Sequence, residues 1–167
     1  MRKEAIDKPL PTTVFVYTPD SWAKIADDIA RIDLHAFADP SSDIREHVRD
    51  GFSRPNFDNP ELLTVLLQSE TGSVIGYSQA EQFWTHVSAR IVRTALAPEY
   101  QGHGLVGSLM GKMEAELKDR GVTVVMRKVR INNGYAEAIR RHYGERIVKD
   151  YTDGIRTAEE RCFVIKI

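Results

Sequence analysis

Residues 96–110 read Leu96-Ala97-Pro98-Glu99-Tyr100-Gln101-Gly102-His103-Gly104-Leu105-Val106-Gly107-Ser108-Leu109-Met110. This segment contains the end of a predicted strand, a short loop and three glycines that open an amphipathic helix. Backbone N–H groups at the start of a helix have no partner within it and carry the positive end of its dipole. Glycines let a phosphate approach that backbone closely. The segment therefore predicts a pyrophosphate site that needs neither a lysine nor a metal ion.

The segments around this loop predict a mixture of strands and helices. Apolar and β-branched runs predict strands over residues 13–17, 62–69, 74–83, 88–97, 122–126, 147–151 and 162–167. Apolar spacing and helix-start residues predict helices that begin near residues 21 and 40, and helices over 104–120 and 132–143, with a loop over 51–60. The run Val122–Met126 is typical of a strand buried on both faces. Because this order is not a repeating βα pattern, it predicts an α+β fold with a mixed sheet and helices on both faces.

The composition indicates one globular domain. The chain has 167 residues, of which 42% are apolar and 28% are charged, and this excludes a largely disordered or fibrous protein. We expect a flexible arm over residues 1–11, which ends at Pro9-Leu10-Pro11, and a single domain over residues 12–167. The single cysteine, Cys162, excludes an internal disulfide framework and a cysteine-rich zinc site.

Charge and hydropathy limit the classes of partner. No apolar run approaches the ~20 residues that span a bilayer, and the first residues lack the apolar core of a signal peptide, so we expect a cytoplasmic protein without a membrane partner. The net charge of −1 gives no global field for nucleic acid. Residues 1–70 hold 8 basic and 13 acidic side chains, whereas residues 120–149 hold 8 and 2. Either both regions are solvated surface, or the first faces a cationic partner and the second a polyanionic one.

Two known patterns compete for the glycine loop. Gly102, Gly104 and Gly107 match the dinucleotide fingerprint G-x-G-x-x-G, and Arg127 on the next strand is placed to contact a 2′-phosphate. Fingerprint glycines normally follow directly on a strand, however, whereas residues 98–101 intervene here. Only 60 residues follow Gly107, which is too few for a full doubly wound domain.

The second pattern resembles the GCN5-related N-acetyltransferase (GNAT) family, whose motif is Q/R-x-x-G-x-G/A. Here it reads Gln101-Gly102-His103-Gly104-Leu105-Val106, with Val106 in place of the last small residue and Gly107 directly after it. Asn133, Ala136 and Gly144 fit the family's second motif. The order of elements resembles the family from residue 14 to the C-terminus.

The resemblance implies a mostly antiparallel, splayed sheet of six to seven strands and acetyl-CoA as cosubstrate. The pantetheine would lie in the splay like an extra strand, against the backbone of Thr94, Ala95 and Leu96. The pyrophosphate would lie on the loop, Asn133 would contact the pantetheine arm, and Arg140 with Arg141 would neutralise the CoA phosphates. The loop residues concerned are Gln101, Gly102, His103, Gly104, Leu105, Val106 and Gly107. No metal is expected, because His35 and His103 have no partner at ligand spacing.

The implied reaction is direct attack of an amine on the thioester in a ternary complex, with a backbone N–H near Leu96 as oxyanion donor. The family's acid is a tyrosine seven residues after the asparagine, but that position is Arg140. Tyr143, one turn later, is the predicted catalytic acid, and Arg140 is an alternative as a fixed charge beside the thiolate. The family's basic glutamate is replaced by Lys128, which is no base at neutral pH.

The base and the acceptor stay open at this level. Glu81 and His86 are candidate bases, although both are also typical exposed hairpin residues, and a water chain or an already neutral amine is an equal alternative. The acceptor is expected to be an amine-bearing small molecule or peptide; the acidic first part of the chain suggests a cationic one. The resemblance is compatible with a homodimer. The alternative function is a non-catalytic acyl-CoA-binding or regulatory module on the same fold.

Overall fold

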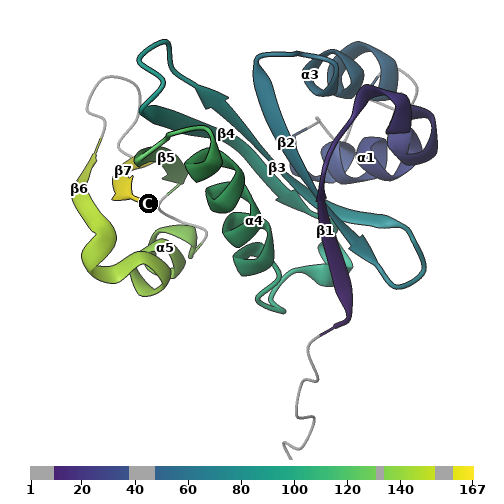
Figure 1. Cartoon of the computed structure of the whole chain (residues 1–167). Helices are drawn as coiled ribbons and strands as arrows, with labels where there is room; N and C mark the ends of the chain where they lie inside the picture. Colours follow the sequence, from purple (N-terminus) through teal and green to yellow (C-terminus); the bar gives the residue numbers. More distant parts are fainter. Residues whose placement is uncertain (1–9, 38–47, 131–133, 153–159) are drawn as a thin grey trace, which may run out of the picture.

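A computed structural model describes residues 10–37, 48–130, 134–152 and 160–167. The described strands form one seven-stranded sheet in the order β1-β2-β3-β4-β5-β7-β6 (Figure 1). All neighbouring strands are antiparallel except β4 and β5, which run parallel. The strands are β1 (Thr12–Val16), β2 (Leu62–Ser69), β3 (Val74–Gln82), β4 (Ser88–Leu96), β5 (Val124–Arg130), β6 (Ile147–Thr152) and β7 (Glu160–Lys166).

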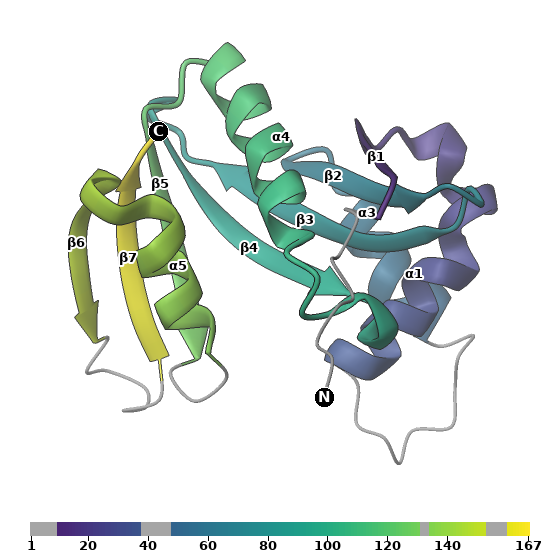
Figure 2. The same ribbon diagram turned by 90° about the horizontal axis from the view of Figure 1, so that it is seen from below.

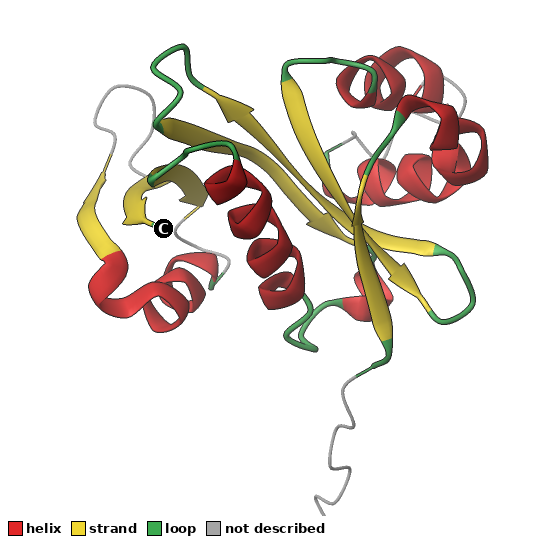
Figure 3. Ribbon diagram, viewed as in Figure 1, coloured by secondary structure: helices red, strands yellow, loops and turns green. Residues whose placement is uncertain are grey.

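Helices cover both faces of this sheet (Figures 2 and 3). On one face, α1 (Trp22–Ala36) and the short α3 (Arg54–Phe57) pack on β2 and β3 through Ile29, Phe57 and Tyr77. On the other face, α4 (Val106–Asp119) inserts Leu109 and other apolar side chains against β2, β3 and β4. Helix α5 (Tyr135–Tyr143) packs on β5 and β7. It lies on the same face as α4, because its partner Ile165 stands opposite Val125, which belongs to the α4 core.

The sheet parts between its two parallel strands. β4 and β5 pair only from Ser88 with Val124 to Ile91 with Arg127. Beyond this point β4 continues along β3, whereas β5 continues along β7. Figure 2 shows the two strands diverging. From Val92 to Leu96, therefore, the edge of β4 that faces away from β3 has no strand beside it in the described part of the chain.

The predicted α+β fold with a mixed, splayed sheet is confirmed, and the strand predicted over residues 62–69 has those bounds. Two predictions about the structure or burial of whole segments were wrong. Residues 48–57 are helical rather than partly a loop, because Ser53 bonds the buried Asp33 and Phe57 packs on Tyr77. β5 is not buried on both faces: its side chains alternate, since only the face toward α4 and α5 is covered there.

Of three further predictions, one differs from the structure at the start of a helix, and two concern residues that the structure describes only in part. Helix α4 begins at Val106 rather than Gly104, because Gly102 and Gly104 have φ of 80° and 73°, which no right-handed helix contains. The helix start predicted near residue 40 and most of the predicted N-terminal arm, residues 1–9, lie outside the described residues. No described helix is long and apolar enough to cross a bilayer.

Candidate active site

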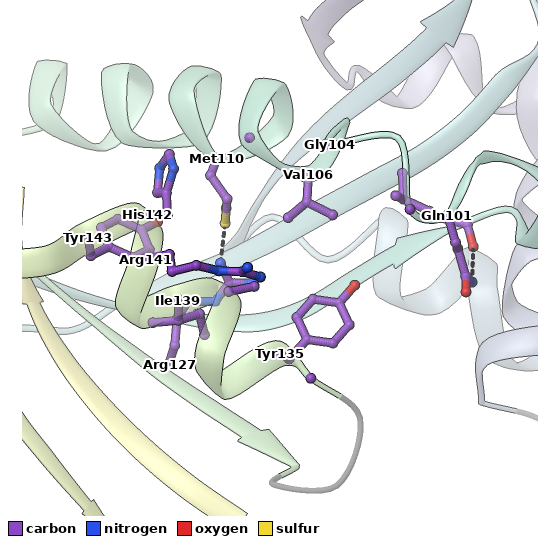
Figure 4. A pocket seen from close by; sticks show the side chains of 15 residues that line it. Gln101, Gly104, Val106, Met110, Arg127, Tyr135, Ile139, Arg141, His142 and Tyr143 are labelled. Atoms are coloured by element: carbon purple, nitrogen blue, oxygen red, sulfur yellow. Dashed lines mark hydrogen bonds between the residues drawn. The ribbon is translucent and has the colours of Figure 1, made fainter. Parts of the chain in front are cut away.

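A cleft of about 610 Å³ lies between the N-terminal half of α4 and helix α5, on the face of the sheet that both helices cover (Figure 4). We call it the first cleft. The side chains of Val106, Met110, Tyr135 and Arg141 point into it. Its full lining is Leu96, Gln101, Gly102, Gly104, Val106, Gly107, Met110, Arg127, Gly134, Tyr135, Ala138, Ile139, Arg141, His142 and Tyr143.

The glycine loop supplies this cleft with free backbone donors. Within the described part of the chain, the N–H groups of residues 102–106 donate to no acceptor, although those of Gly107 and Ser108 do. Gly102 and Gly104 have positive φ, and a Cβ on either would meet no atom within 4 Å. Successive unpaired donors at the start of a helix are the arrangement that protein sites for anions use.

Leu96 directs its backbone into the gap between β4 and β5. The N–H of Ala97 donates to the carbonyl oxygen of Ile75 on β3, at 2.8 Å. Because successive residues of an antiparallel strand direct their backbone groups to opposite edges, Leu96 and Thr94 direct theirs away from β3, and Ala95 does not. The carbonyl oxygen of Leu96 accepts a hydrogen bond from Gln101 Nε2 at 3.2 Å. The Leu96 N–H is thus a backbone donor in the gap, as an oxyanion site requires.

A second cleft, of about 320 Å³, borders the same gap and reaches the C-terminal end of α1. Most of its lining comes from β4, β5 and the end of α1, and the rest from the glycine loop and α5: Ala36, Phe37, Ile91, Val92, Arg93, Thr94, Ala95, Leu96, Gln101, Arg127, Lys128, Val129, Arg130 and Tyr135. Leu96, Gln101, Arg127 and Tyr135 line both clefts. The splay therefore brings the two clefts together at one junction.

Arg127 is the buried cation of this junction, with 6% of its surface exposed. Its Nη2 atom donates to Thr94 Oγ1 at 3.2 Å, and its Nη1 atom donates to the sulfur of Met110. The guanidinium thus connects β5 with β4 and with α4. A charge held in a site of low polarity acts more strongly on a neighbouring charge than it would in water.

Tyr143 is buried at the C-terminal end of α5 and lines the first cleft only. Burial raises the pKa of its hydroxyl to about 12; the positive charge of Arg127 opposes this shift and the negative charge of Glu114 adds to it. Glu114 in turn forms an ion pair with Arg146, whose Nη1 atom lies 2.9 Å from Oε2 of Glu114. The Tyr143 hydroxyl therefore keeps its proton at neutral pH.

The other predicted contacts for CoA divide into three groups. Gln101, Gly102, Gly104, Val106 and Gly107 line the first cleft, whereas His103 and Leu105 do not, since Leu105 belongs to the core beneath α4. Thr94 and Ala95 line the second cleft. Asn133 lies outside the described residues.

Arg140 and Arg141 lie on different sides of α5. Arg140 donates to Asp150 at 3.0 Å and stacks over the ring of Phe163, and it lines neither cleft. Arg141 lines the first cleft beside His142. Of the two arginines considered for the CoA phosphates, the structure places Arg141 in the cleft.

The candidate bases lie away from the junction. Glu81 pairs with Arg90 and His86 lies in the β3–β4 hairpin, and neither lines a cleft. Lys128 lines the second cleft and pairs with Glu160 at 2.6 Å. The described lining of the two clefts contains no aspartate or glutamate.

Tyr135 is a junction residue that the sequence motifs did not single out. It is the first residue of α5, follows Gly134 (φ 76°) and lines both clefts. In Figure 4 its ring faces Val106 across the first cleft. The available signal was its position two residues after Asn133, which places it at the start of the helix that the motif predicts.

A sequence profile of the acetyltransferase (GNAT) family matches residues 23–144. The chain belongs to the GNAT family. The matched region runs from α1 to the end of α5 and so includes the glycine loop and the residues of the junction. No curated protein sequence matches this chain significantly.

Solved structures with this GNAT fold cover nearly the whole chain. The PaiA N-acetyltransferase of Thermoplasma acidophilum, crystallised with coenzyme A, superimposes with a TM-score of 0.66 and 16% identity over 94% of this chain and 99% of its own. An aminoglycoside 6′-N-acetyltransferase, also crystallised with coenzyme A, superimposes with a TM-score of 0.66 and 9% identity, over 92% of this chain and 96% of its own. The IAA acetyltransferase of Bacillus cereus superimposes with a TM-score of 0.62 and 15% identity, over 94% of this chain and 100% of its own. At such identities the likeness shows the fold.

Membership of the GNAT family identifies the class of chemistry as acyl transfer from a CoA derivative. The GNAT assignment replaces the alternative interpretation of Gly102, Gly104 and Gly107 as a dinucleotide-binding fingerprint. The short turn Pro98–Tyr100, which separates these glycines from β4, agrees with the GNAT assignment. The first cleft has the free backbone donors that a CoA pyrophosphate would need.

Proposed function

We propose that this GNAT protein transfers the acetyl group of acetyl-CoA to an amine by direct attack in a ternary complex. The observation that carries the proposal is the junction of two clefts at the splay, where Leu96, Gln101, Arg127 and Tyr135 line both. One cleft can hold the thioester and the other the amine, so the two reactants meet without an acyl-enzyme. Holding both in position supplies a large part of the rate enhancement.

Acetyl-CoA would occupy the first cleft. Its pyrophosphate would accept hydrogen bonds from the N–H groups of residues 102–106, and Arg141 would add a positive charge beside the phosphates. The pantetheine would follow the open edge of β4, where Thr94 and Leu96 direct backbone groups into the gap. This arrangement supports acetyl-CoA as the cosubstrate and favours Arg141 alone for the phosphate contact that was expected of Arg140 and Arg141 together.

The reaction forms one C–N bond and breaks one C–S bond. A neutral amine in the second cleft attacks the thioester carbonyl, and the Leu96 N–H donates to the oxygen of the tetrahedral intermediate. CoA then leaves as a thiolate and takes up a proton, and the acetylated nitrogen loses its extra proton to water. Because no carboxylate lines either described cleft, we propose water rather than a side chain as the base.

Two tyrosines are candidates for the proton that the thiolate takes up. Tyr135 lies at the junction, whereas Tyr143 lines only the first cleft and holds its proton with a pKa of about 12. We assign the proton to Tyr135 and give the Tyr143 hydroxyl a structural role beside Glu114 and Arg127. Arg127 would stabilise the developing negative charge from its buried position.

The test is the release of free CoA thiol from acetyl-CoA in the presence of a panel of amines: amino acids, amino-acid amides, polyamines, aminoglycosides and peptides with free N-termini. Acetyl transfer predicts thiol release that depends on one class of amine, with the acetylated amine identified by mass spectrometry. Tight binding of acetyl-CoA without turnover on any amine would instead support the non-catalytic acyl-CoA-binding module.

A further inference from the structure

We propose that the acceptor amine also carries a carboxylate, which binds to the cationic wall of the second cleft formed by Arg93, Lys128 and Arg130. This inference rests on the proposed acetyl transfer and adds the chemical class of the acceptor. It departs from the cationic acceptor that the acidic first part of the sequence suggested.

The charges that line the second cleft have one sign. Its described lining contains four cationic side chains, those of Arg93, Arg127, Lys128 and Arg130, and no carboxylate. A protonated polyamine or aminoglycoside would meet repulsion from every one of these charges. An anion would be attracted, and a concave wall of one charge also concentrates counter-ions.

Three of these cations lie on one face of the sheet. Arg93 reaches toward α1, because its guanidinium stacks over the rings of Phe37 (5.7 Å) and Phe52 (4.8 Å). Since side chains alternate along β5, Lys128 and Arg130 point to the face opposite to Arg127. Arg127 reaches α4 on its own face, which leaves the other three as the wall beneath the end of α1.

The anionic groups near this wall neutralise it only in part. Glu160 pairs with Lys128 at 2.6 Å. Asp33 lies in electrostatic range of Arg93, but its carboxylate is buried and accepts hydrogen bonds from Ser53 and Tyr77. The side chain of Arg130 has no ion pair or hydrogen bond within the described part of the chain.

The shape of the cleft agrees with a small acceptor that carries a carboxylate. A volume of about 320 Å³ is at the lower end of small-molecule sites and suits a compound of amino-acid size. Guanidinium groups bind carboxylates through two parallel hydrogen bonds, so Arg93 and Arg130 can fix the carboxylate while the amine reaches Leu96 and Tyr135 at the junction. The apolar ring of Phe37 would cover the body of the acceptor.

Matched amines test the inference. Three amino acids, L-alanine, L-phenylalanine and L-glutamate, are each compared with the corresponding α-carboxamide and with the amine that lacks the α-carboxylate, with spermidine and kanamycin as polycations. We expect kcat/KM for an accepted amino acid to exceed that of its carboxamide by about tenfold or more. Equal values for acid and amide, or a preference for the polycations, would overturn the inference and leave acetyl transfer intact.

Two variants connect the preference to the wall. Arg130→Gln and Arg93→Gln should each raise the KM of the amino acid by about tenfold and leave the KM of acetyl-CoA unchanged. Lys149→Gln is the matched control, because Lys149 is exposed on β6 and lines neither cleft. If Arg93→Gln unfolds the protein because Arg93 no longer stacks over Phe37 and Phe52, Arg130→Gln still tests the inference. If both variants fold and neither changes that KM, the inference is wrong; if no amine releases thiol at all, the proposed acetyl transfer itself fails.

Discussion

The Nη2 atom of Arg127, the last residue of β5 that pairs with β4, donates a hydrogen bond of 3.2 Å to Oγ1 of Thr94, which lies on β4 beyond the paired part of the two strands. The contact crosses the gap at which the two clefts meet, and Arg127 lines both of them. A buried arginine at this point gives the junction a fixed positive charge next to the proposed path of the thioester. The proposed chemistry therefore depends on a side-chain contact that connects the two strands just beyond their last paired residues.

Replacing Arg127 by methionine, which is similar in length and has no charge, should lower kcat/KM for acetyl transfer on the order of a hundredfold. The reason is the loss of a charge that stabilises the intermediate and the thiolate. The measurement is the rate of thiol release, with circular dichroism to confirm folding. Arg90→Met is the control, because Arg90 lies on the same strand pair outside both clefts. Equal rates for the two variants would exclude Arg127 from the mechanism.

Arg141→Gln should raise the Kd of acetyl-CoA by about tenfold and reduce the dependence of Kd on salt, because one charge beside the phosphates is lost. Arg140→Gln should leave this Kd unchanged and lower the melting temperature instead, because it breaks the contacts with Asp150 and Phe163. Both variants change the net charge equally, so calorimetry at two salt concentrations separates a local contact from a general field. The opposite assignment of effects would support Arg140 as the phosphate ligand.

Gly76→Ala should destabilise the protein by about 1–3 kcal/mol and lower activity. A Cβ at Gly76 would lie 2.3 Å from Leu96 Cδ2 and 2.9 Å from the carbonyl oxygen of Ala95, so β4 must shift where it directs the Leu96 N–H into the gap. Gly111→Ala is the control. Gly111 is an exposed residue of α4 where a Cβ meets no atom within 4 Å, so this variant should stabilise the protein by up to about 1 kcal/mol. Denaturant unfolding of both variants gives the comparison; similar stabilities would contradict the contact.

Tyr143→Phe should change stability more than catalysis. The folded pKa of Tyr143 is about 12, above its usual value of 10, so its contribution to stability is present below pH 10 and is lost as the pH rises through 12. The free energy of unfolding of the wild type should therefore fall more steeply between these pH values than that of Tyr143→Phe. Tyr17, whose burial also raises its pKa to about 12, is common to both proteins. Parallel pH dependences would contradict this account.

Kinetics of the same variant complete the test of the two tyrosines. Tyr143→Phe should keep kcat within a few-fold of wild type, whereas Tyr135→Phe should lower it on the order of a hundredfold, as general acids contribute about 10²–10⁴-fold. The reverse order would restore Tyr143 as the acid.

The local parts of the fold and site could be predicted from the sequence. The glycine loop was recognisable because both its turn conformations and its free N–H groups follow from the spacing of Gly102 and Gly104 ahead of an apolar helix. Tyr135 could not be recognised, because its role depends on how α5 lies relative to β4 across the gap, and these segments are about forty residues apart in the chain. The choice between Arg140 and Arg141 depended on the rotation of α5. That rotation is set by which side chains pack on Phe163 and Ile165, and here they are Ala136, Ile139 and Tyr143.

The most direct test of the account is a calorimetric titration of acetyl-CoA into the wild type, Gly107→Glu and Gly111→Glu. Both glycines lie in α4 with open space at the Cβ position, so both variants should fold, but only Gly107 lines the first cleft. We expect one site per chain in the wild type and in Gly111→Glu, and a loss of at least about tenfold in affinity in Gly107→Glu, where a carboxylate would face the pyrophosphate. Unchanged affinity in Gly107→Glu, or no binding to the wild type, would contradict it.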